Sequence, residues 1–357
     1  MEKKEYHVIG VMSGTSLDGI DLAQVRFRLG KEWQFEILNA QTIDYSENWK
    51  SKLKGLSNHD YNTLQSIDKS YTLYLGEVIN GFIKRNKIKE IDAVCSHGHT
   101  ARHQPDSGVT YQIGNRAELA TLISQTLVCD FRVQDVAFGG QGAPLVPIGD
   151  KLLFSKFDYC INLGGFANIS LEKDNTRIAY DICPVNIVLN HYANLLGLDY
   201  DAGGGIARSG NIDMGLLTKL NALDYYKAPY PKSLGVEWVD LCVLPLIDAF
   251  KLEIKTILRT FVEHVAHQIV AELDQVKARH KSSVLVTGGG AYNTFLIERI
   301  KDLTKHDVLI PSNKVVEFKE ALIFGFLGVL KLQGKNNCLK SVTGAIKDHS
   351  SGQVFLR

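Results

Sequence analysis

Residues 7–29 read HVIGVMSGTSLDGIDLAQVRFRL, and this stretch decides the fold. An apolar, β-branched run leads into the polar turn SGTSLDG and then into a segment whose side chains alternate inward and outward, which is typical of strand, turn and strand. Residues 159–173 repeat the design as YCINLGGFANISLEK. The two copies lie about 150 residues apart, which is too far for a solenoid repeat and indicates two similar domains.

Helix and strand patterns alternate between and after these two hairpins. Apolar residues recur near a period of 3.6 in residues 62–85 and 117–124, whereas residues 91–95 form a short strand-like run. A long amphipathic helix is predicted over residues 251–278 and should pack against a sheet. It is followed by SSVLVTGGGAYNTFLIERI (282–300), which predicts strand, glycine turn and helix. The predicted fold class is therefore α/β.

The composition favours small-molecule chemistry in a reducing compartment. The 357 residues carry a formal charge of +1, so no overall field attracts nucleic acid or anionic lipid. Six scattered cysteines without a CxxC pair suit reducing conditions and argue against structural zinc. The N-terminus lacks a signal-peptide core, and the apolar stretch 321–330 is too short to cross a membrane and predicts a buried helix. We therefore expect a cytoplasmic protein without nucleic-acid or membrane partners.

Three glycine-rich turns follow apolar strands and predict phosphate binding. They are GTSLDGID (14–21), NLGGFANIS (162–170) and VTGGGAYN (286–293). Glycine lets backbone N–H groups approach phosphate oxygens closely, and Thr15 and Ser16 add hydroxyl donors. Asp18 and Asp21 could orient a hydrated Mg²⁺. A single turn of this kind would mean little, but three in one chain predict a phosphate site.

The arrangement of these turns resembles that of the actin, hexokinase and Hsp70 superfamily. The chain contains neither GxxxxGK[ST] nor a GxGxxG that opens a helix, so a P-loop and a dinucleotide-binding unit are unsupported. In the superfamily a hairpin from each domain embraces the phosphates of ATP, and a later glycine turn borders the adenosine. The resemblance implies these ATP-binding residues: Gly14, Thr15, Ser16, Leu17, Asp18, Gly19, Ile20, Asp21, Gly164, Gly165, Gly288, Gly289, Gly290 and Asn293.

Longer strings along nearly the whole chain resemble the anhydro-N-acetylmuramic acid kinase family. They are GVMSGTSLDGID (10–21), SHGHTARHQP (96–105), DFRVQDVAFGGQGAPLVP (130–147), INLGGFANIS (161–170), VTGGGAYN (286–293) and SVTGA (341–345). The resemblance implies an enzyme of peptidoglycan recycling that uses ATP and water to convert 1,6-anhydro-N-acetylmuramic acid into N-acetylmuramic acid 6-phosphate. Mg²⁺ is expected as the companion of ATP.

The resemblance also implies an architecture of two ribonuclease-H-like domains with a nucleotide cleft between them. We expect a first domain over residues 1–143 with the first phosphate hairpin. A second, over residues 144–344, would carry the second hairpin and the adenosine turn. Residues 345–357 should return to the first domain. The resemblance alone also suggests a homodimer.

Asp181 is the predicted catalytic base. The reaction needs a carboxylate to activate the water that attacks the anomeric carbon as the internal ether opens. Asp181 follows the predicted strand TRIAY, at the carboxyl end where an open α/β sheet places its site, and it matches the position of the family's catalytic aspartate. The alternative is an N-cap for the helix predicted in NIVLNHYANLL.

Five further residues are assigned to the sugar site by the resemblance. His97, Thr100 and Arg102 follow a predicted strand and could hydrogen-bond sugar hydroxyls or the lactyl carboxylate, which a guanidinium suits well. Arg132 and Asp135 lie in the motif DFRVQD; without the motif, they could be a surface ion pair.

Two histidine-containing segments permit other interpretations. The HxHxxxH pattern of residues 97–103 suggests a metal cluster, but it lacks a supporting cysteine or HExxH helix, and its glycine favours a loop shaped around an organic ligand. Residues 263–267, with one glutamate and two histidines, are expected on the solvated or interfacial side of the long helix.

The chain departs from the family pattern at two places. The family's D-x-G-P-G-N string becomes DICPVN at residues 181–186, and S-H-G-Q-T becomes SHGHT at residues 96–100. Val185 would be strained if the backbone needed a positive φ, so a different loop path is expected. Cys183 is expected to fill space, because no motif couples it to a histidine. The charge of His99 is expected to vary with pH.

These departures leave two alternative functions open. One is a nucleotide-gated binding or regulatory protein that kept the ATP site and lost the sugar chemistry. The other is a kinase for a different amino sugar or hexose.

Overall fold

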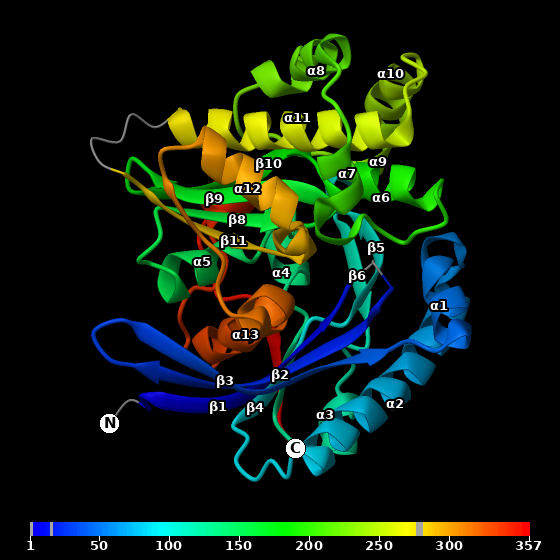
Figure 1. Ribbon diagram of the computed structural model, residues 1–357. Helices are drawn as coiled ribbons and strands as arrows, with labels where there is room; N and C mark the ends of the chain where they lie inside the picture. The colour runs from blue at the N-terminus through cyan, green and yellow to red at the C-terminus, as the bar shows by residue number, and fades with distance from the viewer. Residues whose placement is uncertain (1–2, 15–16, 276–280) are drawn as a thin grey trace. The chain divides into compact units, whose positions relative to one another are not determined.

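The computed structural model describes residues 3–14, 17–275 and 281–357, which form two compact units (Figure 1). Unit 1 comprises the chain up to Phe154 and Phe318–Arg357, and unit 2 comprises Ser155–Glu317. These bounds differ from the predicted domains, because residues 144–154 and 318–344 pack with the first unit. The junction at 317/318 falls inside helix α13 (Asn313–Leu332), whose backbone leaves the helical range at Phe318.

Unit 1 is built on a six-stranded sheet with the order β13-β7-β4-β1-β2-β3. β1, β2 and β3 form an antiparallel meander, β1 pairs in parallel with β4, and β4 pairs in parallel with β7. A separate hairpin consists of β5 (His99–Gln104) and β6 (Val109–Ile113). The strands of the main sheet are β1 (Glu5–Ser13), β2 (Gly19–Leu29), β3 (Trp33–Asp44), β4 (Ala93–Ser96), β7 (Leu127–Cys129) and β13 (Gln353–Phe355).

Helices cover the unit 1 sheet and close its core. The predicted helix at 62–85 is confirmed as α2 (Tyr61–Arg85), which Asp60 caps and whose buried face includes Leu64, Tyr71 and Phe82. The predicted buried helix at 321–330 is confirmed within α13. The shorter helices are α1 (Glu47–Lys54), α3 (Glu118–Ile123), α4 (Val133–Ala137), α5 (Pro147–Leu153) and α14 (Lys340–Thr343).

α13 packs directly on the backbone of β1. A Cβ atom on Gly10 would lie 1.8 Å from the carbonyl oxygen of Ala321, so only glycine allows this approach.

Every helix of residues 3–14, 17–275 and 281–357 is too short or too polar to cross a lipid bilayer.

Unit 2 repeats the topology of unit 1. Its five-stranded sheet has the order β10-β9-β8-β11-β12. The first three strands again form an antiparallel meander, and the first of them pairs in parallel with the fourth, which pairs in parallel with the fifth. The predicted pair of similar α/β halves is therefore confirmed at the level of strand order and direction. The strands are β8 (Tyr159–Leu163), β9 (Phe166–Lys173), β10 (Thr176–Pro184), β11 (Ser283–Thr287) and β12 (Asp307–Leu309).

The long predicted helix of unit 2 is confirmed as α11 (Ile254–Asp274), which lies across its sheet (Figure 1). Its buried stripe joins the unit 2 core through Leu258, Phe261, Val265, Ile269 and Leu273. The other helices are α6 (Asn186–Asn194), α7 (Gly205–Ser209), α8 (Met214–Asn221), α9 (Val236–Trp238), α10 (Leu244–Asp248) and α12 (Thr294–Leu303).

In each unit, three parallel strands end at the same edge of the sheet. In unit 1 these are β1, β4 and β7, which lead into the first glycine turn, residues 97–98 and residues 130–132. In unit 2, β8 and β11 lead into the second and third glycine turns. Because parallel strands share one carboxyl edge, motifs distant in sequence become neighbours there.

Candidate active site

His97 and Arg132 meet at the carboxyl edge of the unit 1 sheet. Arg132 donates from Nε to Nε2 of His97 across 2.8 Å, and Nδ1 of His97 lies 2.9 Å from the carbonyl oxygen of Gly98. Burial and the nearby Arg132 charge hold the pKa of His97 well below its usual range. The buried ring is therefore neutral: Nδ1 donates to the Gly98 carbonyl, and Nε2 accepts from Arg132. A direct hydrogen bond from His97 to a sugar stays a prediction.

A buried chain of hydroxyl groups ends at His99. Tyr71, Tyr45 and Ser13 are linked by contacts of 2.6 Å between their oxygens, and Ser13 Oγ lies 2.7 Å from Nδ1 of His99. Burial lowers the pKa of His99 to about 4. The expectation that its charge would vary with pH is therefore wrong near neutrality: the ring stays uncharged, as the glutamine of the family pattern would be.

We predict that His99→Gln reduces the decrease in the free energy of unfolding between neutral and acid pH. The unfolded chain binds a proton at His99 near pH 6.5, but the folded chain does so only near pH 4, so falling pH favours unfolding between these values. Urea unfolding at pH 7 and pH 4.5 should show a loss in the wild type that exceeds the loss in the variant by about 2 to 3 kcal/mol. Equal losses in both proteins would show that the folded ring titrates normally.

The other residues predicted for the sugar site take different places in unit 1. Thr100 is half-buried on β5, and Arg102 donates to the carbonyl oxygen of His59. Asp135 is fully buried: its Oδ2 accepts from the Gly142 N–H at 2.8 Å and its Oδ1 accepts from the Thr343 hydroxyl at 2.8 Å. The alternative of a surface ion pair between Arg132 and Asp135 is wrong, because Asp135 has no exposed surface. Its contact with sugar stays a prediction.

The first glycine turn joins β1 to β2. Thr15 and Ser16 lie outside the described residues. Leu17 has a φ of 61°, and its N–H donates to the Gly14 carbonyl at 3.3 Å. Gly19 and Ile20 begin β2. Asp18 is exposed at the turn, whereas Asp21 accepts a hydrogen bond of 2.6 Å from the Thr42 hydroxyl. Carboxylate oxygens are the donors that Mg²⁺ prefers, so Asp18 fits the predicted contact through water.

The second and third glycine turns lie side by side in unit 2. Gly288 has a φ of 82°, and a Cβ there would lie 2.6 Å from Oδ1 of Asn162 and 2.8 Å from the carbonyl oxygen of Leu163, where β8 ends. The second turn is tied in addition to the start of α6, because the carbonyl of Gly165 accepts from the Val185 N–H at 2.8 Å. The structure thus brings Gly164, Gly165, Gly288, Gly289 and Gly290 together.

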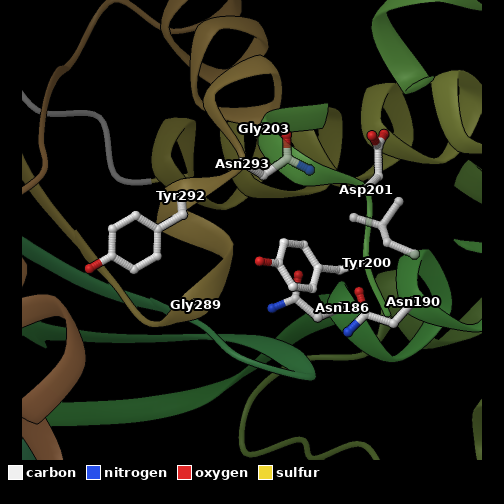
Figure 2. Close-up of a pocket in the computed structure, with 9 residues that line it drawn as sticks. Asn186, Asn190, Tyr200, Asp201, Gly203, Gly289, Tyr292 and Asn293 are labelled. Carbon is white, nitrogen blue, oxygen red and sulfur yellow. The ribbon is translucent and has the colours of Figure 1, made fainter. Parts of the chain in front are cut away.

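A pocket of about 330 Å³ opens beside the third glycine turn (Figure 2). Gly289 and Asn293, both predicted to bind ATP, line it together with Tyr292 from the same turn. Asn293 also caps α12, accepting from the Leu296 N–H at 3.0 Å. The remaining lining residues come from α6 and the segment that follows it: Asn186, Leu189, Asn190, Tyr200, Asp201 and Gly203.

Those six pocket residues were not predicted from the sequence. The available signal for this part of the pocket was the string DAGGG at residues 201–205, whose three glycines match the run of three glycines in the third glycine turn at residues 288–290. Asp201 organises this segment by accepting from the N–H groups of Ile206 and Ala207, each at 2.9 Å. Glu320 on α13 was not predicted either; its side chain is exposed, and its carboxyl interacts electrostatically with Arg132 and Asp21.

Asp181 lies within β10 rather than after it. The strand continues to Pro184, and a bulge between Asp181 and Cys183 interrupts its pairing with β9. Its Oδ2 accepts from the Leu234 N–H at 2.9 Å, and Oδ1 has no hydrogen-bond partner within the described part of the chain. Burial raises the pKa of the carboxyl, and the Leu234 N–H opposes that rise. A half-buried carboxylate with one available oxygen has the properties of a general base.

The residues after Asp181 settle two alternatives. Val185, not Asp181, occupies the N-cap position of α6, so the N-cap explanation for Asp181 is wrong. Val185 has a φ of −131°, so this backbone does not require glycine, and the strain considered for valine does not arise from a positive φ. Cys183 and Val185 are both fully buried, and Cys183 fills space as expected.

The two histidine-containing segments lie in different units, residues 97–103 in unit 1 and residues 263–267 in unit 2. Within residues 3–14, 17–275 and 281–357, the side chains of residues 97–103 do not meet as a metal-binding group. Glu263 and His264 are buried, so of the two expected positions on α11, solvated or interfacial, the structure shows the interfacial one. Glu263 binds Arg259 and Arg299, and His264 contacts the Tyr226 hydroxyl and the Asn221 side chain.

The matches to known proteins extend over nearly the whole chain. The family model described as anhydro-N-acetylmuramic acid kinase matches residues 6–357. The chain is 33% identical over 372 residues to the anhydro-N-acetylmuramic acid kinase of Pasteurella multocida, covering 99% of this chain and 98% of the relative. It is 34% identical over 379 residues to the enzyme of the same name from Mannheimia succiniciproducens, with 99% of each covered.

A solved structure aligns along the chain at low sequence identity. It is the activator of the 2-hydroxyisocaproyl-CoA dehydratase from Clostridium difficile with bound ADPNP, at a TM-score of 0.46 and 11% identity, covering 92% of this chain and 97% of that one. The sequence matches decide the classification, since they reach 34% identity over 99% of both chains. This chain belongs to the anhydro-N-acetylmuramic acid kinase family.

Proposed function

We propose that this protein is an ATP-dependent kinase that hydrolytically opens 1,6-anhydro-N-acetylmuramic acid and phosphorylates O6, giving N-acetylmuramic acid 6-phosphate and ADP in peptidoglycan recycling. The observation that carries the proposal is the family match over residues 6–357. The half-buried Asp181, which has one carboxylate oxygen available, supports the hydrolytic step, since it supplies the base that this step requires.

In this proposal Asp181 removes a proton from the water that attacks the anomeric carbon. The bond between that carbon and O6 breaks, and O6 takes the γ-phosphoryl group of ATP. The raised pKa of Asp181 makes it a stronger base than a solvated aspartate, while the Leu234 N–H orients its carboxylate. Arg132, held by His97, would bind the lactyl carboxylate of the sugar, together with contacts from Thr100 and Arg102.

We assign the nucleotide phosphates to the three glycine turns and the adenosine to the pocket beside Gly289. The pocket has the size and composition of a small-molecule site, with two tyrosines and amide side chains at its wall. When bound, Mg²⁺ would neutralise phosphate charge, and Asp18 would hold it through water. The need for ATP and the six cysteines, which are not joined in disulfides in the described part of the chain, support a cytoplasmic location, and we retain the homodimer as part of the proposal.

The expected activity is release of ADP that depends on the anhydro sugar. Purified protein is incubated with Mg²⁺-ATP, with and without 1,6-anhydro-N-acetylmuramic acid, in water enriched in ¹⁸O, and the sugar product is analysed by mass. The product should gain one phosphoryl group and one water, with the solvent oxygen at the anomeric carbon.

Other outcomes separate the alternatives. Phosphorylation without incorporation of solvent oxygen would indicate a kinase for an ordinary amino sugar. Binding of ATP with equal ADP release in both samples would instead favour a nucleotide-gated regulatory protein.

A further inference from the structure

Cys338 and His349 face each other in the C-terminal part of unit 1. They form an antiparallel bridge in which each N–H donates to the carbonyl of the other, across 3.1 Å and 3.2 Å. Residues directly opposite each other in such a pair project their side chains to the same side. The thiol and the imidazole are therefore neighbours although ten residues separate them.

Asp135 of α4 completes a buried group with these two side chains. Its Oδ1 lies 3.5 Å from Nε2 of His349, and one ligand atom from each of the three residues lies within 4.8 Å of the others. All three residues are at least nine-tenths buried. Within the described part of the chain, only these three side chains form a group of histidine, cysteine and acidic residues whose ligand atoms all lie this close together.

His349 is anchored through one ring nitrogen and turns the other towards Asp135. Its Nδ1 lies 3.1 Å from the carbonyl oxygen of Lys347, so a proton on Nδ1 is directed to that carbonyl. In a neutral ring Nε2 then carries the lone pair, and this buried atom has no hydrogen-bond partner in the described structure. An imidazole anchored through one nitrogen, with the other facing carboxylate and thiol, is the arrangement that metal-ligating histidines adopt.

We propose that Asp135 Oδ1, Cys338 Sγ and His349 Nε2 bind a Zn²⁺ ion, in addition to the Mg²⁺ that accompanies ATP. Nitrogen, sulfur and oxygen donors together suit zinc, which accepts all three, and three protein ligands leave a fourth position for water. Binding displaces the thiol proton to solvent, and the thiolate and carboxylate then neutralise the charge of the ion. The Nε2 to Oδ1 distance is close to the roughly 3.3 Å expected between tetrahedral ligands at zinc bond lengths.

The ion would link the C-terminal segment, which contains Cys338 and His349, to α4, the helix that begins directly after Arg132. Asp135 lies on α4, and its Oδ2 accepts from the Gly142 N–H. Without a metal, burial and the charge of Asp135 raise the pKa of the Cys338 thiol to about 12, so the thiol stays protonated. The three side chains then pack as part of the buried core, where the Phe138 ring meets the His349 ring edge-on. The metal-free packing is the competing explanation.

Cobalt reports directly on the sulfur ligand. The full-length chain, reduced and freed of metal with a chelator, is titrated with Co²⁺ in the presence of excess Mg²⁺, which occupies oxygen-rich sites. We expect one equivalent to bind with a thiolate-to-cobalt charge-transfer band and the intense visible bands of a four-coordinate ion, and Zn²⁺ to displace it. Cys338→Ser should lose the charge-transfer band, and His349→Gln should weaken binding at least tenfold.

Cys242→Ser is the matched control, because Cys242 is a partly exposed cysteine outside the cluster, and it should retain the wild-type spectrum. X-ray absorption of the zinc-loaded wild type should show a single sulfur neighbour, which tests the proposal even if a variant fails to fold. Absence of a charge-transfer band in the wild type, or its persistence in folded Cys338→Ser, would overturn the proposal. Either result leaves the proposed kinase activity untouched, because that assay is independent.

Discussion

Replacing Asp181 with asparagine is expected to lower sugar-dependent ADP release by about two to four orders of magnitude while ATP binding survives. Asparagine keeps the shape and can still accept from the Leu234 N–H, but it cannot take a proton from water. Initial rates with saturating sugar and ATP measure the loss, and equilibrium titration with ATP measures nucleotide affinity.

The same position predicts the acid limit of the reaction. Burial raises the pKa of Asp181, and the base must be ionised, so the rate should fall with decreasing pH through a pKa above that of a solvated aspartate. Asp174→Asn is a matched control, because Asp174 is exposed in the turn between β9 and β10 at a φ of 50°, which asparagine tolerates. Near-wild-type activity in Asp181→Asn would remove Asp181 from the mechanism.

Gly288→Ala is expected to have the largest effect on the nucleotide site. Gly288 combines a φ of 82° with a ψ of 166°, a region that only glycine adopts readily, and occupying it with alanine costs about 1 to 3 kcal/mol. The new methyl group would in addition meet the Asn162 side chain at 2.6 Å and the Leu163 carbonyl at 2.8 Å, so the third turn must move away from the second. We expect a lower melting temperature and ATP affinity reduced at least tenfold.

Gly205→Ala is the matched control for Gly288→Ala, because it adds the same methyl group where the backbone does not require glycine. Gly205 begins α7 close to the same pocket and has a φ of −64°, and a Cβ atom added to it would point into open space, with no neighbouring atom within 4 Å. Alanine should therefore raise stability by up to about 1 kcal/mol and leave ATP affinity unchanged. Thermal unfolding with and without ATP compares both variants, and equal ATP affinity in Gly288→Ala and wild type would argue against phosphate or adenosine binding at this turn.

Much of the local structure could be predicted because its signals lie within a few residues. The glycine turns at 14–19 and 164–165, the period of α2 and the stripe of α11 all depend on near neighbours in sequence. The duplicated hairpin was enough to predict two similar halves. The sequence could not decide whether Glu263 and His264 are solvated or interfacial, because their partners Arg299, Tyr226 and Asn221 come from other elements.

By itself, the sequence determined the α/β class, the repeated hairpin, the family motifs and Asp181 as the candidate base, because hydrophobic period, glycine placement and motif strings are local properties of the chain. Only the tertiary structure decided that His97 holds Arg132, that a bulge presents Asp181, that residues 186–203 complete the pocket, and that Asp135 meets Cys338 and His349. The physical reason is that strand pairing and helix packing bring together residues far apart in the chain, and their burial then sets which groups are charged and which remain available.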